Sequence, residues 1–434
     1  MTGVPAGGDV LIRTPQWLQP AAARTFARLF VPGDETLIHG ESRAQAVVDR
    51  ILELSDDAAE ETLARTLDRF AGRHRDLPAT LERNCQLVAH RLGREITAGT
   101  RRRLLIGAYF TQEYALEAAA LFNPSMVAHP DQTGCQPGEV RFIMSLRAIG
   151  EGHLSSIEFR TGTIEANAHI RLDSPGRFVD TGRSQPVPSD CDPSRYTVVF
   201  DERSVVSERV LWPAAPAESN GMEDARFVRF ADGGDATYYA TYTAFDGSEV
   251  APHLLETADF QTFTACPLSG PSARNKGMAL FPRRVGGRFA ALSRWDRESN
   301  AVAYSDDGRH WDEAVTIQVP ERPWELTQLG NCGSPIETPV GWLVFTHGVG
   351  PMRDYAIGAI VLDLDEPERL IAALPAPLLV AEGAERVGYV PNVVYSCGAM
   401  RHGGTVVLPY GCSDSSVRIA VVDLGLLLDR LLAR

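Results

Sequence analysis

The sequence lacks the long hydrophobic run that a membrane-spanning helix needs, since no stretch of about 18 apolar residues is uninterrupted. It also lacks a basic stretch followed by an apolar one near its first residue, the pattern typical of a secretory leader. We therefore expect a cytoplasmic protein.

Basic residues and paired cysteines are also scarce. Lys and Arg number 42 against 56 Asp and Glu, a formal net charge of -14, and such a surface repels phosphate backbones and anionic lipids. The seven cysteines are scattered, odd in number and never spaced as a CxxC pair, which argues against a disulfide framework or a zinc knuckle. We expect no nucleic-acid partner, no membrane partner, no metal and no organic cofactor.

The 434 residues that are present have two textures. From residue 42 to 121 the chain is rich in Ala, Leu, Glu and Arg, with apolar residues at helical spacing. This pattern predicts an N-terminal helical segment of three or four helices, assigned to residues 1–115. Pro78 is expected to break one helix, and Leu87, Val88 and Leu92 to begin the apolar face of the next.

Beyond residue 121 the pattern changes to short alternating β runs separated by turns rich in Gly and Pro. Five runs look like copies of one strand: 141–147, 237–244, 288–294, 342–347 and 405–411. The last three intervals are roughly 50–60 residues, the length of one four-stranded blade. The repeats predict a mainly β fold, a five-bladed β-propeller over residues 116–422. A short C-terminal helix over 423–434 is expected to pack against the helical segment.

Acidic residues in the loops between the expected blades are candidates for chemistry. A closed propeller leaves a central channel on which polar residues at strand ends converge. Glycosidic cleavage needs a carboxylic acid for the leaving oxygen and a positioned nucleophile. Asp224, Glu385 and Asp414 are the three candidate catalytic acids. Taken alone, Glu223, Asp224 and Arg226 are also typical of an ion-paired turn that caps the backbone.

Basic residues give a second pattern. Cationic and polar side chains recur at matching positions of successive blades, where an arginine fork suits phosphate. They are Arg147, Arg274, Lys276, Arg294, His347 and Tyr355. Singly, an arginine or lysine is more often a solvated surface residue, and His347 is equally compatible with a satisfied core histidine.

Several ordered blocks resemble glycoside hydrolase family 130, which comprises inverting β-mannoside phosphorylases and β-1,2-mannosidases. They include 221–226 (GMEDAR, with Ala225 where the family has proline), 239–244 (YATYTA), 335–343 (PIETPVGWL), 391–394 (PNVV) and 410–414 (YGCSD). The resemblance spans about residues 122–420 and leaves the helical segment outside. Some family members carry helical extensions that support oligomers, so the resemblance allows a homo-oligomer formed through that segment.

The resemblance also implies roles for single residues. Asp224 is similar to the family's proton donor, which acts through a substrate hydroxyl, and Glu385 and Asp414 match acids that line the sugar site. The implied substrate-binding residues are Asn123, Arg147, Glu223, Arg226 and Asn392. The implied phosphate-binding residues are Arg274, Asn275, Arg294, His347 and Tyr355. One position departs from the family pattern: Gln328 or a neighbour stands where the phosphorylases have a lysine.

Three functions stay open at this point. The leading hypothesis is an inverting phosphorylase that cleaves a β-mannooligosaccharide with inorganic phosphate as co-substrate. The alternative is an inverting β-1,2-mannosidase in which Glu385 or Asp414 activates water. A non-catalytic sugar-binding propeller is the third. The sequence leaves linkage, chain length, the aglycone sugar and the oligomeric state open.

Overall fold

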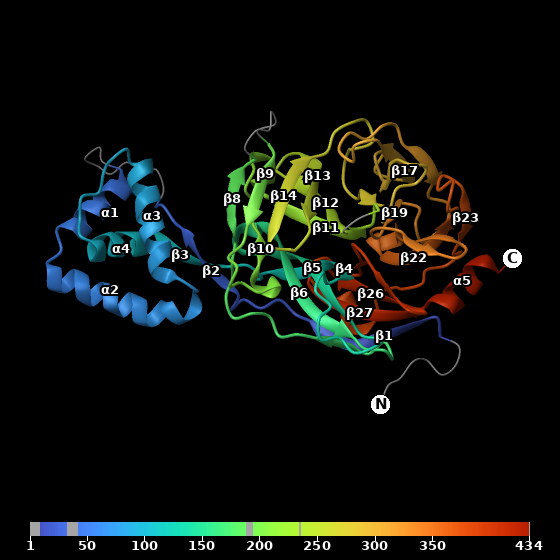
Figure 1. Cartoon of the computed structure of the whole chain (residues 1–434), viewed down its shortest axis with the longest axis horizontal. Helices are drawn as coiled ribbons and strands as arrows, with labels where there is room; N and C mark the ends of the chain where they lie inside the picture. The colour runs from blue at the N-terminus through green and yellow to red at the C-terminus, as the bar shows by residue number, and fades with distance from the viewer. Residues whose placement is uncertain (1–8, 33–41, 188–193, 234–235, 434) are drawn as a thin grey trace. The chain divides into compact units, whose positions relative to one another are not determined.

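The computed structural model describes residues 9–32, 42–187, 194–233 and 236–433. The chain forms two compact units, labelled by element in Figure 1. Unit 1 comprises Met1–Ala21, Glu117–Gly176 and Asp180–Arg434, and unit 2 comprises Ala22–Leu116 and Arg177–Val179. Among the described residues, every helix is too short or too polar to span a bilayer.

Unit 2 is helical, with one small two-stranded sheet. Ser42 and Ser55 cap the first two helices by accepting hydrogen bonds from backbone N–H groups, as short polar side chains do at helix starts. The elements are α1 (Arg43–Leu52), α2 (Asp56–Phe70), α3 (Leu77–Arg91), α4 (Thr100–Tyr109), β2 (Thr25–Leu29) and β3 (Thr111–Ala115). The apolar faces of the helices meet in one core that contains Val48, Leu63, Val88, Ile106 and Phe110.

Pro78 has the opposite role to the one expected from sequence. It lies in the first turn of α3, which begins after Asp76 accepts a hydrogen bond from the Ala79 N–H at 3.3 Å. Proline is tolerated there because the first N–H groups of a helix have no intrahelical partner. Leu87 and Val88 therefore continue this helix, and Leu92 ends it.

Unit 1 contains five groups of mainly antiparallel strands. The first comprises β4 (Ala120–Ala128), β5 (Val140–Ile149), β6 (Ser155–Ile164), β7 (Ile170–Leu172) and β10 (Val210–Leu211). The second comprises β11 (Gly221–Phe230), β12 (Thr237–Phe245), β13 (Val250–Thr257), β14 (Thr262–Pro267), β9 (Tyr196–Val199) and β8 (Arg183–Pro186). One parallel pair, Gly221 with Ser155, joins these two groups into a single sheet.

The other three groups are separate sheets. The third comprises β15 (Ala279–Leu280), β16 (Phe289–Ser293), β17 (Asn300–Ser305) and β18 (Val315–Gln318). The fourth comprises β19 (Gln328–Asn331), β20 (Ile336–Thr338), β21 (Gly341–Val349), β22 (Tyr355–Leu362) and β23 (Leu370–Ala373). The fifth comprises β24 (Val394–Tyr395), β25 (Met400–His402), β26 (Thr405–Cys412), β27 (Ser416–Asp423) and β1 (Leu11–Leu18).

The five repeated runs seen in the sequence are equivalent strands. They are β5, β12, β16, β21 and β26, each of which lies between the first strand of its group and the next long one. All nine residues of β21 are buried, as expected for a strand covered on both faces. The prediction that these runs are strands is therefore confirmed, and each has a comparable place in its group.

The first strand of the chain belongs to unit 1, not to the helical unit. β1 pairs antiparallel with β27, so that Leu11 lies opposite Val422 and Leu18 opposite Val417. The register shifts between Arg13 and Trp17, a stretch that contains Pro15, which cannot donate to a ladder. The sequence-based assignment of residues 1–115 to one helical segment is wrong for these residues, because a pairing across the whole chain leaves no local signal.

The C-terminal helix α5 (Leu424–Leu432) forms where it was expected, but it packs elsewhere. Leu424, Leu427 and Leu431 are buried in a cluster with residues of β22, β26 and β27. The expectation that this helix packs against the helical segment is wrong, because its apolar face covers the sheets of unit 1.

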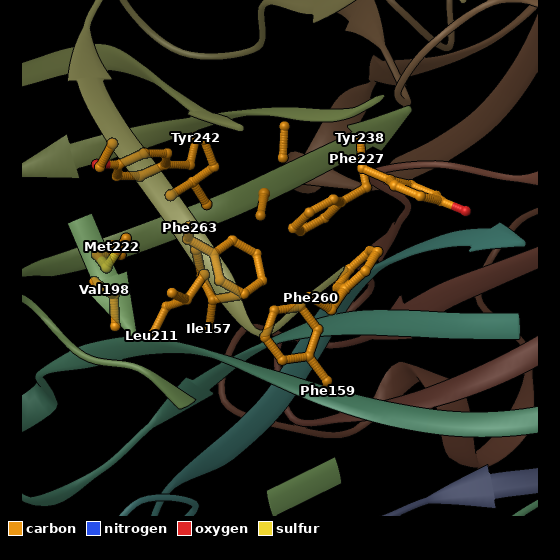
Figure 2. Packing of buried hydrophobic residues seen from close by; sticks show 14 of the residues in the cluster. Ile157, Phe159, Val198, Leu211, Met222, Phe227, Tyr238, Tyr242, Phe260 and Phe263 are labelled. Carbon is orange, nitrogen blue, oxygen red and sulfur yellow. The ribbon is translucent and has the colours of Figure 1, made fainter. Parts of the chain in front are cut away.

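An aromatic core fixes the first two strand groups against each other (Figure 2). Phe159 of β6 contacts Phe227 of β11, Phe260 and Phe263, with ring centroids 5.8–5.9 Å apart. Such pairs contribute about 0.5–1.5 kcal/mol each beyond their buried area. This core lies three residues from Asp224 along β11, so the strand that carries Asp224 has a rigid base.

Candidate active site

Two bulges bring the first pair of site residues together. The register of β11 against β12 shifts between Glu223 and Arg226, and the register of β4 against β5 shifts between Phe122 and Ser125. Asp224 and Asn123 lie in these bulges with φ of 56° and 49°. Asn and Asp tolerate this left-handed conformation better than other residues with a Cβ atom.

The side chains at the bulges form one hydrogen-bonded group. Asn123 Nδ2 donates to Asp224 Oδ1 at 2.7 Å, and Arg147 Nη1 lies 3.4 Å from the same oxygen. Arg147 Nη2 donates to Glu223 Oε1 at 2.6 Å, and Lys276 Nζ pairs with Glu223 Oε2. Four residues predicted to contact sugar or carry catalysis, Asn123, Arg147, Glu223 and Asp224, therefore lie together.

The charge balance of this group sets the protonation of Asp224. Burial alone would raise the pKa of Asp224, but the positive charges of Arg147 and Lys276 and the Asn123 hydrogen bond outweigh it and lower the pKa. Asp224 is therefore a carboxylate at neutral pH in the unliganded protein.

Asp414 lies near this group with the opposite protonation behaviour. Burial and the negative charge of Asp224 raise the pKa of Asp414 to about 6, although Arg147 and Arg353 act against them. Its backbone is also left-handed, with φ of 49°. Two neighbouring carboxylates with pKa values pushed apart are typical of acid and base roles in enzymes.

Replacing Asp414 with asparagine is expected to stabilise the protein above pH 6. Ionising Asp414 costs more in the folded than in the unfolded chain, so wild type loses stability as pH rises through about 6. Since one pKa unit corresponds to ~1.4 kcal/mol, the variant should gain about 1–3 kcal/mol at pH 8 and little at pH 4. Urea unfolding at both pH values measures this. Asp365→Asn, which removes an exposed carboxylate, is the control.

Arg226 links the acidic group to a second set of polar residues. Arg226 Nη1 donates to the side-chain oxygen of Asn331 at 2.6 Å and to its carbonyl oxygen at 3.0 Å, and Nη2 donates to Tyr395 Oη at 2.6 Å. His347 Nδ1 lies 3.3 Å from the same Asn331 carbonyl oxygen. Arg226 is 2% exposed, so these contacts hold its guanidinium inside the protein.

His347 orients Arg294 and does not add a positive charge. Arg294 Nη1 donates to His347 Nε2 at 3.0 Å, so the imidazole proton is assigned to Nδ1. Burial and the charges of Arg294 and Arg226 lower the pKa of His347 well below its ordinary value. A side chain at position 330 would clash with this imidazole, since a Cβ there would come within 2.5 Å of its Cε1 atom, and glycine occupies that position.

Arg294 has one donor without a partner in the part of the chain that the structure describes. Its Nε is buried and has no hydrogen-bond partner among the described residues. Buried donors without a partner are rare in folded proteins. Tyr355 stacks on His347 with ring centroids 6.1 Å apart, and Gln328 Nε2 donates to Tyr355 Oη at 3.3 Å. Arg294, His347 and Tyr355 of the expected phosphate set are therefore contiguous.

Three other predicted residues have different surroundings. Arg274 is exposed and makes no hydrogen bond or ion pair within the described ranges. Asn275, with φ of 62°, donates to the Trp295 carbonyl and accepts from Arg297 Nε at 2.9 Å. Asn392 accepts from Arg386 Nε at 2.8 Å, and its carbonyl accepts from the Tyr355 N–H at 3.0 Å. Asn275 and Asn392 thus shape loops in this structure.

Glu385 does not join the other two acids through any contact in the described part of the chain. Its Oε1 accepts from Arg13 Nε at 3.2 Å, Tyr410 Oη at 2.8 Å and Arg418 Nη1 at 3.1 Å. Burial acts to raise the pKa of Glu385, but Tyr410, the Glu382 N–H and Arg13 outweigh it and lower the pKa. The carboxylate of Glu385 is therefore occupied by two arginines and a tyrosine, and the convergence of the three acids stays a prediction.

Glu385 instead supports Asp414 through the backbone. Ser413 Oγ donates to the Glu385 carbonyl oxygen at 2.6 Å, and Asp414 follows directly.

Three polar residues of the site were not predicted as site residues from the sequence: Lys276, Asn331 and Tyr395. Only Lys276 carried a signal, as a member of the repeated basic set, whereas Asn331 and Tyr395 are identified solely by their contacts with Arg226.

Known proteins match both the sequence and the fold. Residues 201–432 match the glycoside hydrolase 130 family model, described as beta-1,4-mannooligosaccharide phosphorylase. The chain is 32% identical over 216 residues to a 1,2-beta-oligomannan phosphorylase of Thermoanaerobacter sp. (strain X514). This alignment covers 48% of this chain and 70% of that protein. The chain is 30% identical over 216 residues to the beta-1,2-mannobiose phosphorylase of Listeria innocua, which covers 48% of this chain and 59% of that protein.

A solved structure of the beta-1,2-mannobiose phosphorylase from Listeria innocua, in complex with beta-1,2-mannobiose, has a similar fold. Its TM-score is 0.53 at 20% identity, and the match covers 74% of this chain and 94% of that one. Residues 201–432 include Asp224, Arg294, His347 and Asp414, so the family match coincides with the site built above. The chain belongs to glycoside hydrolase family 130.

Proposed function

We propose that this chain is an inverting phosphorylase of β-mannosides, which converts a β-mannooligosaccharide and phosphate into mannose 1-phosphate and a shortened sugar. The observation that carries the proposal is the buried, unpartnered Nε of Arg294, connected through His347, Asn331 and Arg226 to the strand of Asp224. An arginine beside a carboxylate pair offers a place for phosphate and a group for proton transfer, the two needs of phosphorolysis. The relatives named above, which are mannoside phosphorylases, support it.

The reaction balances without a metal or an organic cofactor. A phosphate oxygen attacks the anomeric carbon from the face opposite the leaving group, the bond to the bridging oxygen breaks, and that oxygen takes a proton. Inversion of a β-mannoside gives the α anomer of mannose 1-phosphate. We assign the proton to Asp224, passed through a hydroxyl of the substrate.

Asp224 must first gain that proton, since its pKa is lowered in the unliganded protein. A bound phosphate adds negative charge nearby, and a bound sugar displaces water; both effects raise the pKa of a carboxyl group. Substrate binding should therefore be coupled to proton uptake. Arg294, held by His347, supplies the charge-assisted donors that phosphate needs.

A specific observation favours the hydrolase as second candidate. Gln328, the first residue of β19, donates a neutral hydrogen bond to Tyr355. The family resemblance implies a lysine in the phosphorylases where Gln328 or a neighbour stands here, so the phosphate set has one cation fewer. Asp414, with a pKa of about 6, could then serve as the base for a water molecule. Glu385 is not proposed for that role, because its carboxylate is ion-paired.

The deciding experiment is incubation with β-1,2- and β-1,4-mannobiose, with and without inorganic phosphate, followed by product identification. The proposal expects mannose 1-phosphate in the presence of phosphate and no cleavage in its absence. Release of free mannose at the same rate in both conditions would establish the hydrolase. Binding without any product would leave only a sugar-binding protein.

Gln328→Lys is expected to strengthen phosphate use. The ammonium replaces a neutral amide beside Tyr355, and a charge-assisted hydrogen bond adds about 1.5 kcal/mol. The KM for phosphate should fall about tenfold with little change in kcat, as initial rates at varied phosphate show. Gln328→Met, which removes the amide without adding charge, should not lower this KM. An equal KM in the lysine variant and wild type would mean that phosphate does not bind here.

The proposal extends to the closure of the sheets, the cellular compartment and the partners of the chain. We infer that the five strand groups close as five blades around one axis, which is supported by the pairing of β1 with β27 inside the last group. We propose cytoplasmic residence, in keeping with six unpaired cysteines among the described residues; Cys191 lies outside them. A homo-oligomer through the helical unit, and the absence of nucleic-acid and membrane partners, also stand as proposals.

A further inference from the structure

A cavity of about 240 Å³ lies within the helical unit, outside the part of the chain that the family model matches. It is lined by residues of α2, α3, α4 and the β2–β3 sheet and is partly open to solvent. Since a water molecule takes roughly 30 Å³ of liquid, the cavity has the room of one small ring with a few waters. Its apolar wall comprises Phe70, Leu77, Leu81 and Ala108.

The opposite wall is polar. His74 Nε2 lies 2.9 Å from Glu113 Oε1, and Arg73 Nε lies 2.9 Å from the same oxygen. The His74 side chain is 8% exposed, and burial lowers its pKa, so the imidazole is neutral at pH 7. Because a carboxylate can only accept, Nε2 carries the proton and Nδ1 keeps a lone pair.

This wall leaves two acceptors without a protein partner. Within the described ranges, His74 Nδ1 and Glu113 Oε2 receive no hydrogen bond, and both residues line the cavity. A nearly buried imidazole lone pair without a partner needs a donor from a ligand or from water. The ligand must therefore donate hydrogen bonds.

Charge and shape narrow the class of ligand. Arg73 already neutralises Glu113, so the guanidinium would repel a second cation. The two acceptor atoms, His74 Nδ1 and Glu113 Oε2, would repel an anion. Neutral hydroxyl and N–H groups are the donors that remain. A molecule with hydroxyls on one side and C–H groups toward Phe70 and Leu77 fits both walls.

We propose that this cavity is a second, non-catalytic binding site for a neutral monosaccharide in its ring form. The proposal is independent of the reaction assigned to the sheet unit. It gives the helical unit a ligand of its own, chemically related to the sugars that the family processes. Nothing in it requires the cleavage activity to be phosphorolytic or hydrolytic.

Hydrogen–deuterium exchange of the full-length protein tests the proposal, because peptides report on each unit separately. Mannose is the probe, at about 10 mM, which would saturate a site with a Kd of ~1 mM. We expect slower exchange in peptides covering 62–82 and 104–115. Mannitol, an open-chain polyol, and mannose 6-phosphate, an anion, should not slow exchange there.

Two variants make the result specific. Ala108→Leu fills the cavity with apolar atoms and should abolish the mannose effect in these peptides. Glu113→Gln keeps the size of the side chain and should weaken binding about tenfold, since hydrogen bonds to charged groups are the stronger ones. Circular dichroism and unchanged exchange of the sheet peptides check that both variants are folded.

Three outcomes would overturn the proposal. They are no effect of mannose on the helical peptides of wild type, an equal effect of mannitol, and an effect that persists in Ala108→Leu. Failure of the active-site proposal is seen separately, as the absence of product from mannobiose, and does not bear on this result.

Discussion

Asp224→Asn is expected to lower kcat by about 10²–10⁴-fold, the usual contribution of a general acid. The asparagine amide has nearly the same shape and keeps a partner for Asn123, but it has no proton to give to the leaving oxygen. Arg147 loses one of its two carboxylate partners and keeps Glu223, so the fold should survive. Initial rates with mannobiose and phosphate measure the effect.

Sugar binding separates a catalytic role from a structural one. The Kd of mannobiose, measured by calorimetry, should stay within about tenfold of wild type, because one hydrogen bond is altered and not removed. Asp306→Asn, which breaks an exposed ion pair with Arg288 in the same unit, is the matched control and should keep full activity. Full turnover by Asp224→Asn would exclude Asp224 as the proton donor.

Glu385→Ala is expected to destabilise the fold by about 3–5 kcal/mol, the usual effect of removing one partner of a buried ion pair. The variant would leave Arg13, Arg418 and the Tyr410 hydroxyl without their shared acceptor. Glu385 is 1% exposed, so water cannot replace the carboxylate without a structural change. Guanidinium unfolding of wild type and variant measures the difference.

Glu382→Ala provides the matched control for this loss. Glu382 also pairs with Arg13, at 3.5 Å, but its side chain is 65% exposed, and such pairs contribute about 0–1 kcal/mol. A variant Glu385→Ala that unfolds like wild type but loses turnover would restore Glu385 to the catalytic residues. If the role of Glu385 is structural, Glu385→Ala should instead lose stability, and any loss of turnover should follow from unfolding.

Local patterns were enough to predict the repeated strands, but they did not predict that β1 pairs with β27 in the fifth strand group. Short β runs bounded by turns rich in Gly and Pro identify β5, β12, β16, β21 and β26, and most residues of each strand are buried. The place of β1 beside β27 depends on residues at both ends of the chain. No window of sequence contains both partners.

The site shows the same division between local and distant information. Glu223, Asp224 and Arg226 could be found together because they share one strand with a bulge. Glu385 and Asp414 are equally acidic in sequence, and only the three-dimensional neighbours separate them: two arginines occupy one, whereas burial near Asp224 keeps the other protonated below pH 6. Asn331 could not be predicted, because its role depends on Arg226 and His347, which are distant in sequence and contact its side-chain and carbonyl oxygens.

The pairing of Leu11 with Val422 also constrains how the protein is made. During synthesis the earliest strand emerges long before its neighbour, and it stays without a permanent partner until the final segment leaves the ribosome. Contacts between such distant residues form slowly. A shortened chain that begins after residue 18 would expose the unpaired edge of β27, and such edges promote edge-to-edge aggregation. Folding of this chain thus depends on β1 as well as on the strands that it joins.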